Sequence, residues 1–523
     1  MKPDYDVIIV GGGIAGLTSA AYLSRAGQRT LVIERREKTG GLVNTFWHEG
    51  FAFDGGIRAF EDSGILLPML KNLGIDISFV QSPVSLGIAD RWVTLTSKDS
   101  LAVYESMLMA TFPDHTADVR RITREIKQVM GYMDVLYGIE NPLFLEDMRD
   151  PKYLVQTLLP WLVKYQWNIR KVGRLNAPIY EHLRGLTTNT SLMDMIAQHF
   201  FKNTPTFFAL SYFGLYLDYI YPMGGTKTLA EQMTQFIVRS GGEIRTGISV
   251  QQVDSESHQI LLSGGEKLSY RKLVWAADQK TLYRAIGEPQ SGDIERQRER
   301  VEAGEGSDSI LTVFLGLNLD PEVVARRTGP HAFYTPVLEG LSSLPPWRER
   351  IESNDSLPYD WVAAYLEKTT YEISCPVLRD HSLAPEGQAG LTISTLFDYE
   401  VTQYFAEAGA YEALKEFCIK TIVDIMTRTV FPEIEHHLMF TICATPMTIE
   451  ELSGNSQGAI TGWSFAGADL PSESRFKQIA HSVVTPIPDV VQCGQWTFSP
   501  AGLPISIVTG KLAADRLLKE LKK

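Results

Sequence analysis

Three glycines near the start of the chain have the spacing that could hold the phosphates of a dinucleotide. Gly11, Gly13 and Gly16 fill the glycine positions of a GxGxxG pattern. In that pattern the first glycine permits a tight turn, the second lets the backbone approach a pyrophosphate, and the third lets a helix pack closely on a strand. Glu34, 18 residues after Gly16, would then bind a ribose diol. These residues predict a site for a bound dinucleotide.

The elements that must position these residues follow the order strand, helix, strand. Residues 6–10 (DVIIV) form a short apolar run typical of a buried parallel strand, and residues 17–26 have helical composition. Gly27 is a natural end for that helix, and residues 29–34 (RTLVIE) predict a second buried strand. The helix would direct its unpaired N–H groups at the phosphates. We therefore expect a β–α–β nucleotide-binding unit.

Two further glycine pairs, Gly40-Gly41 and Gly55-Gly56, follow within 45 residues of the first motif. Each pair would let the backbone come close to a flat ligand, because glycine has no side chain to obstruct it. The first motif alone is compatible with NAD or FAD. The succession of glycine sites suits a long cofactor that lies along the domain.

The composition bounds the class of protein. With 523 residues, 44% hydrophobic and 21% charged, the chain is expected to form at least two globular domains. Its net charge of -13 argues against broad nucleic-acid binding. The four cysteines form no CxxC pair, which favours a reduced, cytoplasmic compartment and predicts no metal site. The longest charge-free run, residues 490–510, contains Pro500 and Pro504, so we expect no membrane-spanning segment.

Four blocks of the sequence resemble a family of flavoproteins that includes bacterial phytoene desaturases, carotenoid isomerases and retinol saturase. The first is DVIIVGGGIAGLTSAAYLSRAG with VIERREKTGG and FAFDGG, and the second is YPMGGTKTLA with GGEIRTGISVQQV. The third is ATPMT with the spaced Gly454, Gly458 and Gly462-Trp463, and the fourth is CGQWTFSPAGLPISIVTGKLAADRLL. The blocks touch both ends and the middle of the chain, and the third and fourth are the more selective.

The fourth block departs from the commonest pattern of the family. Gly494-Gln495 stands where many members have Gly-Asp, and Ser499-Pro500 stands where they have Pro-Gly. Gln495 can still hydrogen-bond a ribityl or phosphate oxygen, so FAD binding should survive the change. The departure leaves open the shape of the pocket beside the flavin ring, and with it the substrate.

The resemblance implies an α/β fold that binds FAD. A Rossmann-type FAD-binding domain, of the glutathione-reductase-like kind, would be assembled from residues 1–79, 222–290 and 464–523. Residues 80–221 and 291–463 would form an inserted α+β substrate or cap domain. Residues 502–505 would pass close to the isoalloxazine. A helix over residues 506–521 would point its N-terminus at the flavin pyrimidine, where negative charge collects on reduction.

The FAD-binding residues implied by the motifs and by the resemblance come from all three parts of that domain. They are Gly11, Gly13, Ile14, Ala15, Gly16, Glu34, Arg35, Gly40, Gly41, Leu42, Gly55, Gly56, Ile57, Arg58, Val250, Ala276, Gly494, Gln495, Gly502, Leu503, Pro504 and Ile505. Arg58 is also the candidate catalytic residue, because a guanidinium near the ring could stabilise reduced flavin or anchor a polar substrate head. The alternative is an ion pair between Arg58 and Glu61 or Asp62.

The leading functional hypothesis is an FAD-dependent oxidoreductase that acts on carbon–carbon double bonds of a long apolar isoprenoid or polyene, carotenoid-like or retinoid-like. The resemblance implies desaturation first, with saturation and cis–trans isomerisation as alternatives. Because the sequence contains no GxSxG or HExxH pattern, the flavin itself would carry the redox step. The other hypotheses are a flavin amine oxidase or other small-molecule oxidase, and a non-catalytic FAD- or lipid-binding protein. The electron acceptor, a quinone or oxygen, stays open.

Two aromatic, apolar stretches bear on where the protein works. Residues 153–174 end in Arg170, Lys171 and Arg174, and residues 207–221 carry seven aromatic side chains. Both stretches form either core helices of the cap domain or a channel mouth that dips into a membrane surface. We expect a cytoplasmic protein with an apolar lipid substrate and peripheral membrane contact.

Overall fold

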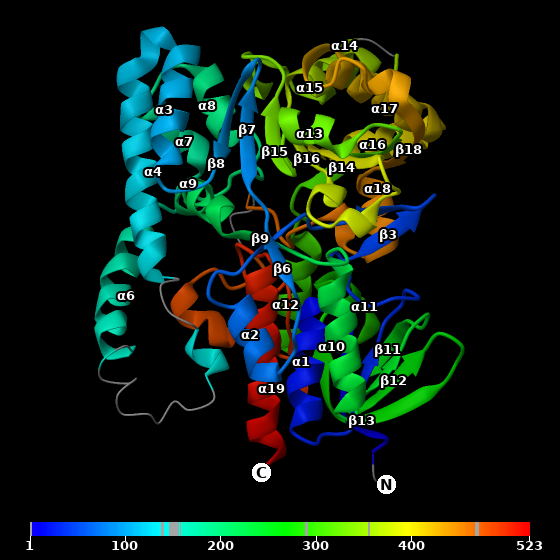
Figure 1. Cartoon of the computed structure of the whole chain (residues 1–523). Coiled ribbons are helices and arrows are strands. Elements are labelled where there is room, and N and C mark those ends of the chain that lie inside the picture. The colour runs from blue at the N-terminus through cyan, green and yellow to red at the C-terminus, as the bar shows by residue number, and fades with distance from the viewer. Residues whose placement is uncertain are drawn as a thin grey trace.

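Two β-sheets organise the computed structural model, which describes residues 3–136, 141–145, 156, 158–287, 291–353, 356–465 and 470–522. The first sheet lies in the lower half of Figure 1 and the second in the upper half. Helices cover the faces of both sheets. This architecture, in which a parallel sheet is interrupted by a second sheet with its own helices, confirms the predicted α/β fold class.

The first sheet has seven strands, and its central part is parallel. The parallel strands, in spatial order, are β10 (Glu243–Arg245), β2 (Thr30–Ile33), β1 (Tyr5–Val10), β13 (Lys267–Trp275) and β19 (Val490–Gln492). The first half of β13 leaves this group and pairs antiparallel with β12 (Gln259–Leu262), which pairs with β11 (Val250–Asp254). Strands from widely separated parts of the chain therefore meet in one sheet.

Alternate residues of β1 enter two separate hydrophobic cores. Val7 and Ile9 pack on one face of the sheet, and Ile8 and Val10 pack on the other. The helices on the first face are α1 (Ile14–Arg25), α2 (Leu66–Leu73), α10 (Lys227–Arg239) and α19 (Leu503–Leu521); those on the second are α11 (Gln279–Ala285) and α12 (Gly292–Ala303). Because successive strand residues point to opposite faces, a continuous apolar strand such as β1 must be covered on both sides.

Two glycines allow the closest approaches among these elements. A Cβ at Gly16 of α1 would lie 2.0 Å from the carbonyl oxygen of Gly11, and a Cβ at Gly510 of α19 would lie 2.4 Å from that of Ala15. Since neither distance is sterically allowed for a side chain, α1 can pack on the turn after β1, and α19 can pack on α1, only with glycine at these positions. Helices α1 and α19, which are far apart in the sequence, thus lie in direct contact.

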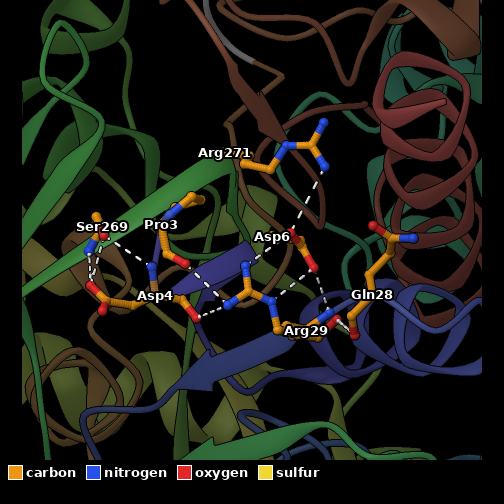
Figure 2. Close-up of polar contacts among 8 residues, drawn as sticks. Pro3, Asp4, Asp6, Gln28, Arg29, Ser269 and Arg271 are labelled. Atoms are coloured by element: carbon orange, nitrogen blue, oxygen red, sulfur yellow. Dashed lines mark hydrogen bonds and ion pairs between the residues drawn. The ribbon is translucent and has the colours of Figure 1, made fainter. Parts of the chain in front are cut away.

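A polar cluster fixes the opposite end of the same strands. Arg29, just before β2, donates hydrogen bonds to the carbonyls of Pro3 and Asp4 and to the Asp6 carboxylate (Figure 2). Asp4 in turn accepts from the backbone N–H of Ser269 in β13 at 2.8 Å. Because the cluster joins β1, the start of β2 and β13, it sets the relative register of the strands that end at the glycine turn.

The second sheet also has seven strands and is antiparallel except where β15 and β7 pair. In spatial order the strands are β18 (Leu438–Ala444), β14 (Ser309–Leu317), β17 (Ala389–Phe397), β16 (Tyr371–Ser374), β15 (His331–Thr335), β7 (Val84–Ile88) and β8 (Arg91–Leu95). Its cores involve α13 (Pro321–Arg327), α14 (Trp347–Ser353), α15 (Tyr359–Lys368), α16 (Tyr399–Glu407), α17 (Tyr411–Thr429), α3 (Ser100–Thr111), α4 (Thr116–Leu136), α7 (Ile179–Arg184), α8 (Thr190–Ala197) and α9 (Thr206–Leu215).

Short strands and helices join the two halves. The strands are β3 (Thr45–His48) with β4 (Phe51–Asp54), and β5 (Phe60–Glu61) with β9 (Tyr219–Pro222) and β6 (Phe79–Gln81). The remaining helices that matter here are α6 (Leu159–Val172) and α18 (Pro446–Ser453). The predicted domain boundaries stay a prediction. Among the described residues, no helix is long and apolar enough to cross a bilayer.

Candidate functional site

A cavity of about 860 Å³ runs between the two sheets. Its walls include the turns that follow β1 and β2, the start of α19, helix α9 and strands β15, β16 and β17. The volume lies within the range of ligand-binding cavities in proteins, roughly 300–1,000 Å³. The carboxyl ends of the parallel strands open into this cavity, which is where α/β sheets bind their ligands.

The cavity brings together nearly all the residues predicted to bind FAD. Those that line it are Gly11, Gly13, Ile14, Ala15, Glu34, Arg35, Gly40, Gly41, Leu42, Gly55, Gly56, Ile57, Arg58, Val250, Ala276, Gly494, Gln495, Gly502, Leu503, Pro504 and Ile505. Gly16 lies behind the wall, where its missing side chain lets α1 approach Gly11. The contact of each residue with FAD stays a prediction, but the set forms one continuous surface.

The glycines of this surface have the geometry of a phosphate cradle. Gly11 has a φ of +105°, which disfavours any side chain. Gly13 is the N-cap of α1, and a Cβ added there would meet no atom within 4 Å. A Cβ at Gly41 would lie 3.4 Å from the Cα of Gly13, so the two backbones face each other closely. Only an open backbone at Gly13 and Gly41 leaves the first turn of α1 accessible to a pyrophosphate.

Glu34 is held at the end of β2 by two backbone N–H groups. Its Oε2 accepts from Gly12 N at 2.7 Å and its Oε1 accepts from Arg36 N at 2.9 Å. The side chain is buried yet lines the cavity. The carboxylate is therefore oriented with lone pairs left for hydroxyl groups, as a ribose diol requires.

The start of α19 forms the opposite wall. Gly502 is its N-cap, and Leu503, Pro504 and Ile505 make its first turn. The first N–H groups of a helix lack intrahelical partners and carry partial positive charge, which suits an electron-rich ring edge. Thr509 accepts a hydrogen bond from Gly494 N at 3.0 Å, which ties α19 to the loop after β19. The residues on both walls fit FAD: a glycine cradle, a ribose acceptor and a helix N-terminus face one space.

Arg58 is buried beneath the cavity, with 2% of its surface exposed. Its guanidinium donates to the carbonyls of Asp54 and Gly56 and, at 2.8 Å, to Ser394 Oγ in β17. Burial lowers its pKa, and the nearby Glu372 and Asp54 charges oppose that shift. Among the described residues, its hydrogen bonds do not go to Glu61 or Asp62, so the expected alternative ion pair does not form. Arg58 joins the Gly55-Gly56 turn to the second sheet.

Asp54 anchors the Gly55-Gly56 turn through several hydrogen bonds. The carboxylate accepts hydrogen bonds from Tyr221 Oη at 2.7 Å, from Thr45 Oγ1 at 2.7 Å and from Thr226 Oγ1 at 2.9 Å. The Arg379 guanidinium lies 3.9 Å from the centre of the Tyr221 ring. A carboxylate with this many donors is saturated, so Asp54 has a structural role and cannot readily act as a base.

The sequence did not reveal the titratable side chains on the cap wall. His331 of β15 and Glu372 of β16 hydrogen-bond through Nε2 and Oε1 at 2.8 Å, and both line the cavity. Burial opposes the charge of Glu372, but the hydrogen bond to His331 and the charges of Arg58 and Arg379 outweigh it and lower its pKa. The pKa of His331 is also lowered, in this case by burial. The pair is best described as a neutral histidine beside a carboxylate.

Two more titratable groups line the cavity. Burial lowers the pKa of His199 to about 4, so this histidine is neutral at physiological pH. Burial raises the pKa of Glu61 in β5 to about 7. No sequence motif surrounds Glu61, Glu372, His199 or His331; they meet only because strands and helices far apart in sequence share this wall.

The rest of the cap wall is aromatic and apolar. Phe200, Phe207, Phe208, Leu215 and Phe333 line the cavity. A second cavity of about 50 Å³ shares His199, Phe200, Tyr212, Tyr216, Phe333 and Thr370 with the first. The apolar space therefore extends beyond the main cavity, behind the wall of α9.

Helix α6 closes another part of the cavity. Trp161 and Ile169 line it, whereas Leu159, Val163 and Trp167 are 58%, 56% and 67% exposed. Because side chains four residues apart share a helix face, the exposed residues form a stripe opposite the cavity-lining ones. Of the predicted stretch 153–174, residues 153–155 and 157 lie outside the described residues. Most of the stretch 207–221 is buried or lines the cavity, as a core helix would.

Comparison with known proteins gives consistent matches across the chain. The profile of a family described as flavin containing amine oxidoreductase matches residues 14–309. All-trans-retinol 13,14-reductase from Danio rerio is 23% identical over 536 residues, which cover 94% of this chain and 82% of that protein. Phytoene desaturase (lycopene-forming) from Pseudescherichia vulneris is 23% identical over 533 residues, 98% of this chain and 99% of that protein. The structure of putrescine oxidase bound to putrescine has a TM-score of 0.60 at 14% identity and covers 98% of this chain and 99% of that one, which shows a shared fold.

Proposed function

The chain belongs to the flavin containing amine oxidoreductase family, and from that premise we propose that this FAD-dependent oxidoreductase acts on carbon–carbon double bonds of a long apolar isoprenoid or polyene. Desaturation is the first reaction to test, with saturation or cis–trans isomerisation of the same class of bond as the alternatives. FAD, when bound, supplies the electron-pair chemistry. The residues of the chain hold the cofactor, orient the substrate and exclude water.

The observation that carries this proposal is the aromatic, apolar wall of the cap. Phe200, Phe208 and Phe333 offer contact to a hydrocarbon chain and few hydrogen bonds to a polar one. The second cavity, behind α9, is lined mainly by apolar and aromatic residues as well. Two matched relatives are named for a retinol reductase and a phytoene desaturase, and both names refer to polyenes. An elongated apolar substrate therefore suits the site better than a small polar one.

The second candidate is an amine oxidase, which the family name and the fold shared with putrescine oxidase favour. The charges near the cap wall argue against it. A protonated amine would meet the buried guanidinium of Arg58, with that of Arg379 behind it. The ionised Glu372 could attract an amine, but it already binds His331 at 2.8 Å, and burial raises the pKa of the cavity-lining Glu61 to about 7, which weakens its negative charge at neutral pH. Like charges in a poorly solvated site repel strongly, so an uncharged substrate is favoured.

Anaerobic flavin bleaching separates the two candidates. We expect the yellow holoenzyme to lose its visible flavin absorption when a carotene or retinoid precursor is added, and to keep it when primary amines or polyamines are added. Reoxidation by added quinone or by air then tests the electron acceptor. Bleaching by amines and not by polyenes would establish the amine oxidase instead.

We also propose that α6 contacts a membrane surface from which the apolar substrate enters. Its exposed stripe, Leu159, Val163 and Trp167, lies opposite the residues that line the cavity, and the exposed Arg170 and Lys171 follow on the next turn. An amphipathic helix with aromatic and basic residues binds the interface between lipid headgroups and acyl chains. Figure 1 shows α6 at the side of the molecule, away from both sheets.

Vesicle flotation tests this contact. The double variant Val163→Glu, Trp167→Glu should lose most of its binding to vesicles that contain anionic lipid. The matched control is Val103→Glu on α3, where a valine that is 55% exposed lies on another element. Equal flotation of the double variant and the control would refute the proposal that α6 contacts the membrane.

A further inference from the structure

Glu61 has an unusual position in the cavity. It lies in β5, which pairs with β9 so that Phe60 is opposite Ile220 and Glu61 is opposite Tyr219. Phe60 and Ile220 enter the hydrophobic core, so the alternation of the strand turns Glu61 and Tyr219 the other way. Both side chains line the cavity.

The carboxyl of Glu61 faces the start of α19. A Cβ added at Gly502, the N-cap of that helix, would lie 3.8 Å from Glu61 Oε1. Among the described residues, no hydrogen bond from another residue to the Glu61 carboxyl oxygens is recorded, although Glu34, Asp54 and Glu372 all have such bonds. Glu61 is partly exposed in the cavity, and a carboxyl that lines a cavity without a protein partner is available to a ligand.

A row of aromatic rings leads from Glu61 to the second carboxylate. The ring of Tyr219 lies 5.6 Å from that of His331, and His331 bonds Glu372. Glu61 and Glu372 are thus two carboxyl groups on one wall, in different surroundings. Glu372 is bound by His331 and lies near two guanidinium groups, whereas the pKa of Glu61 is governed by burial and by its own backbone N–H, with no contribution from a charged neighbour among the described residues.

We propose that Glu61 is a catalytic residue that exchanges a proton with one carbon of the substrate double bond; this rests on the proposed function. In the reducing direction the reduced cofactor would supply a hydrogen with its electron pair to one carbon, while the O–H bond of Glu61 breaks and a C–H bond forms at the other carbon. The carboxylate then regains its proton from water. In the oxidising direction the carboxylate takes the proton as that C–H bond breaks, and FAD would receive the hydrogen of the other carbon together with its electron pair, so that the double bond forms. Each direction conserves atoms and charge.

The titration of Glu61 suits both directions of transfer. A general acid or base works best when its pKa lies near the working pH, and burial brings the pKa of Glu61 to about 7. Tyr219 faces it from β9 and has a pKa raised well above its usual value, so it stays neutral. Asp62 follows directly after β5, and the first turn of α19 presents no titratable side chain. Two carboxyl groups whose pKa values are pushed apart commonly divide the acid and base roles.

The test compares Glu61→Gln with the wild type and with Glu49→Gln, which changes an exposed carboxyl in the turn after β3. All three holoenzymes should contain equal FAD by absorbance. Infrared difference spectra between pH 5 and 9 should show a protonated carboxyl band with a midpoint near 7 in the wild type and in Glu49→Gln. That band should be missing from Glu61→Gln. Single-turnover bleaching by a polyene should be slower in Glu61→Gln by roughly 100-fold or more and lose its pH dependence near 7.

The outcomes separate this proposal from the proposed function. If the wild type turns over a polyene and Glu61→Gln does so with the same rate and pH profile, the catalytic role of Glu61 is refuted and the proposed function stands. The absence of the titrating carboxyl band from the wild type would also refute the catalytic role of Glu61. A titrating band in a protein that no polyene bleaches would overturn the substrate class, and this proton transfer with it.

Discussion

Gly13→Ala tests the cofactor cradle without disturbing the fold. A Cβ at Gly13 meets no protein atom within 4 Å, and the residue has a φ of -71°, which alanine adopts freely. The new methyl group would project only into the cavity. We therefore expect the free energy of unfolding of the apoprotein to change by less than about 0.5 kcal/mol, as for other substitutions that touch nothing.

The expected loss in FAD affinity is large by comparison. The methyl group would push a pyrophosphate away from the first N–H groups of α1. A hydrogen bond to a charged group contributes about 1.5–3 kcal/mol, so the loss of one or two such bonds costs about 3 kcal/mol. That corresponds to FAD binding that is weaker by roughly 100-fold. Titration of the apoprotein with FAD, followed by quenching of flavin fluorescence, measures the change directly.

Two alanine variants are the controls for Gly13→Ala. In Gly16→Ala the Cβ would lie 2.0 Å from Gly11 O, so α1 must shift and the apoprotein should lose about 1–3 kcal/mol of stability or more. Gly131→Ala, on an exposed turn of α4 with no atom within 4 Å, should leave FAD affinity unchanged and stabilise the apoprotein by about 0.5–1 kcal/mol, the usual gain when alanine replaces glycine inside a helix. Wild-type affinity for FAD in Gly13→Ala would refute the cradle, and destabilisation equal to that of Gly16→Ala would refute the open geometry at Gly13.

Two further predictions concern buried charge. Arg58→Lys should lower the free energy of unfolding by about 2 kcal/mol, because one ammonium cannot hydrogen-bond Asp54, Gly56 and Ser394 at the same time. Unfolding in urea measures this change. An unchanged midpoint would contradict the structural role of Arg58. The pKa of Glu61 rises from 4.5 to about 7 on folding, so its contribution to stability is fully present below pH 4.5 and is lost as the pH rises through 7. From pH 5 to pH 8 the wild type should lose up to about 3 kcal/mol relative to Glu61→Gln. Parallel stability curves for the two proteins would show that Glu61 titrates normally.

The nucleotide half of the site was accessible from sequence because its signals are local. The glycines of the first motif, Glu34 and the strands beside them lie within one β–α–β unit, and the structure places them as their spacing predicts. The last helix was expected to begin at residue 506 and begins at Leu503, because Pro504 is tolerated in the first turn of a helix. The predicted start of this helix is therefore wrong by about one helical turn.

The cap half was not accessible because its signals are non-local. His331 and Glu372 are on neighbouring strands 41 residues apart, and neither lies in a recognisable pattern. The sequence indicates Glu61 only as an ion-pair partner for Arg58, because its place in the cavity depends on pairing with β9, which begins at Tyr219. A single charged residue in an otherwise apolar strand, such as Glu372 in YEIS, was the one available hint. Hydrogen-bond partners that come from distant strands leave no periodicity to detect.

The contact between α1 and α19 has a consequence for how the protein is made. The cradle begins with residues near the start of the chain but is completed by β19 and α19, after residue 489. At about 5–20 residues per second, synthesis of the segment between the glycine motif and β19 takes about 25–100 seconds. Throughout that time the groove on α1 beside Ala15 and Thr18 lacks the helix that fills it. A nascent polypeptide on the ribosome should therefore be unable to retain FAD until α19 emerges.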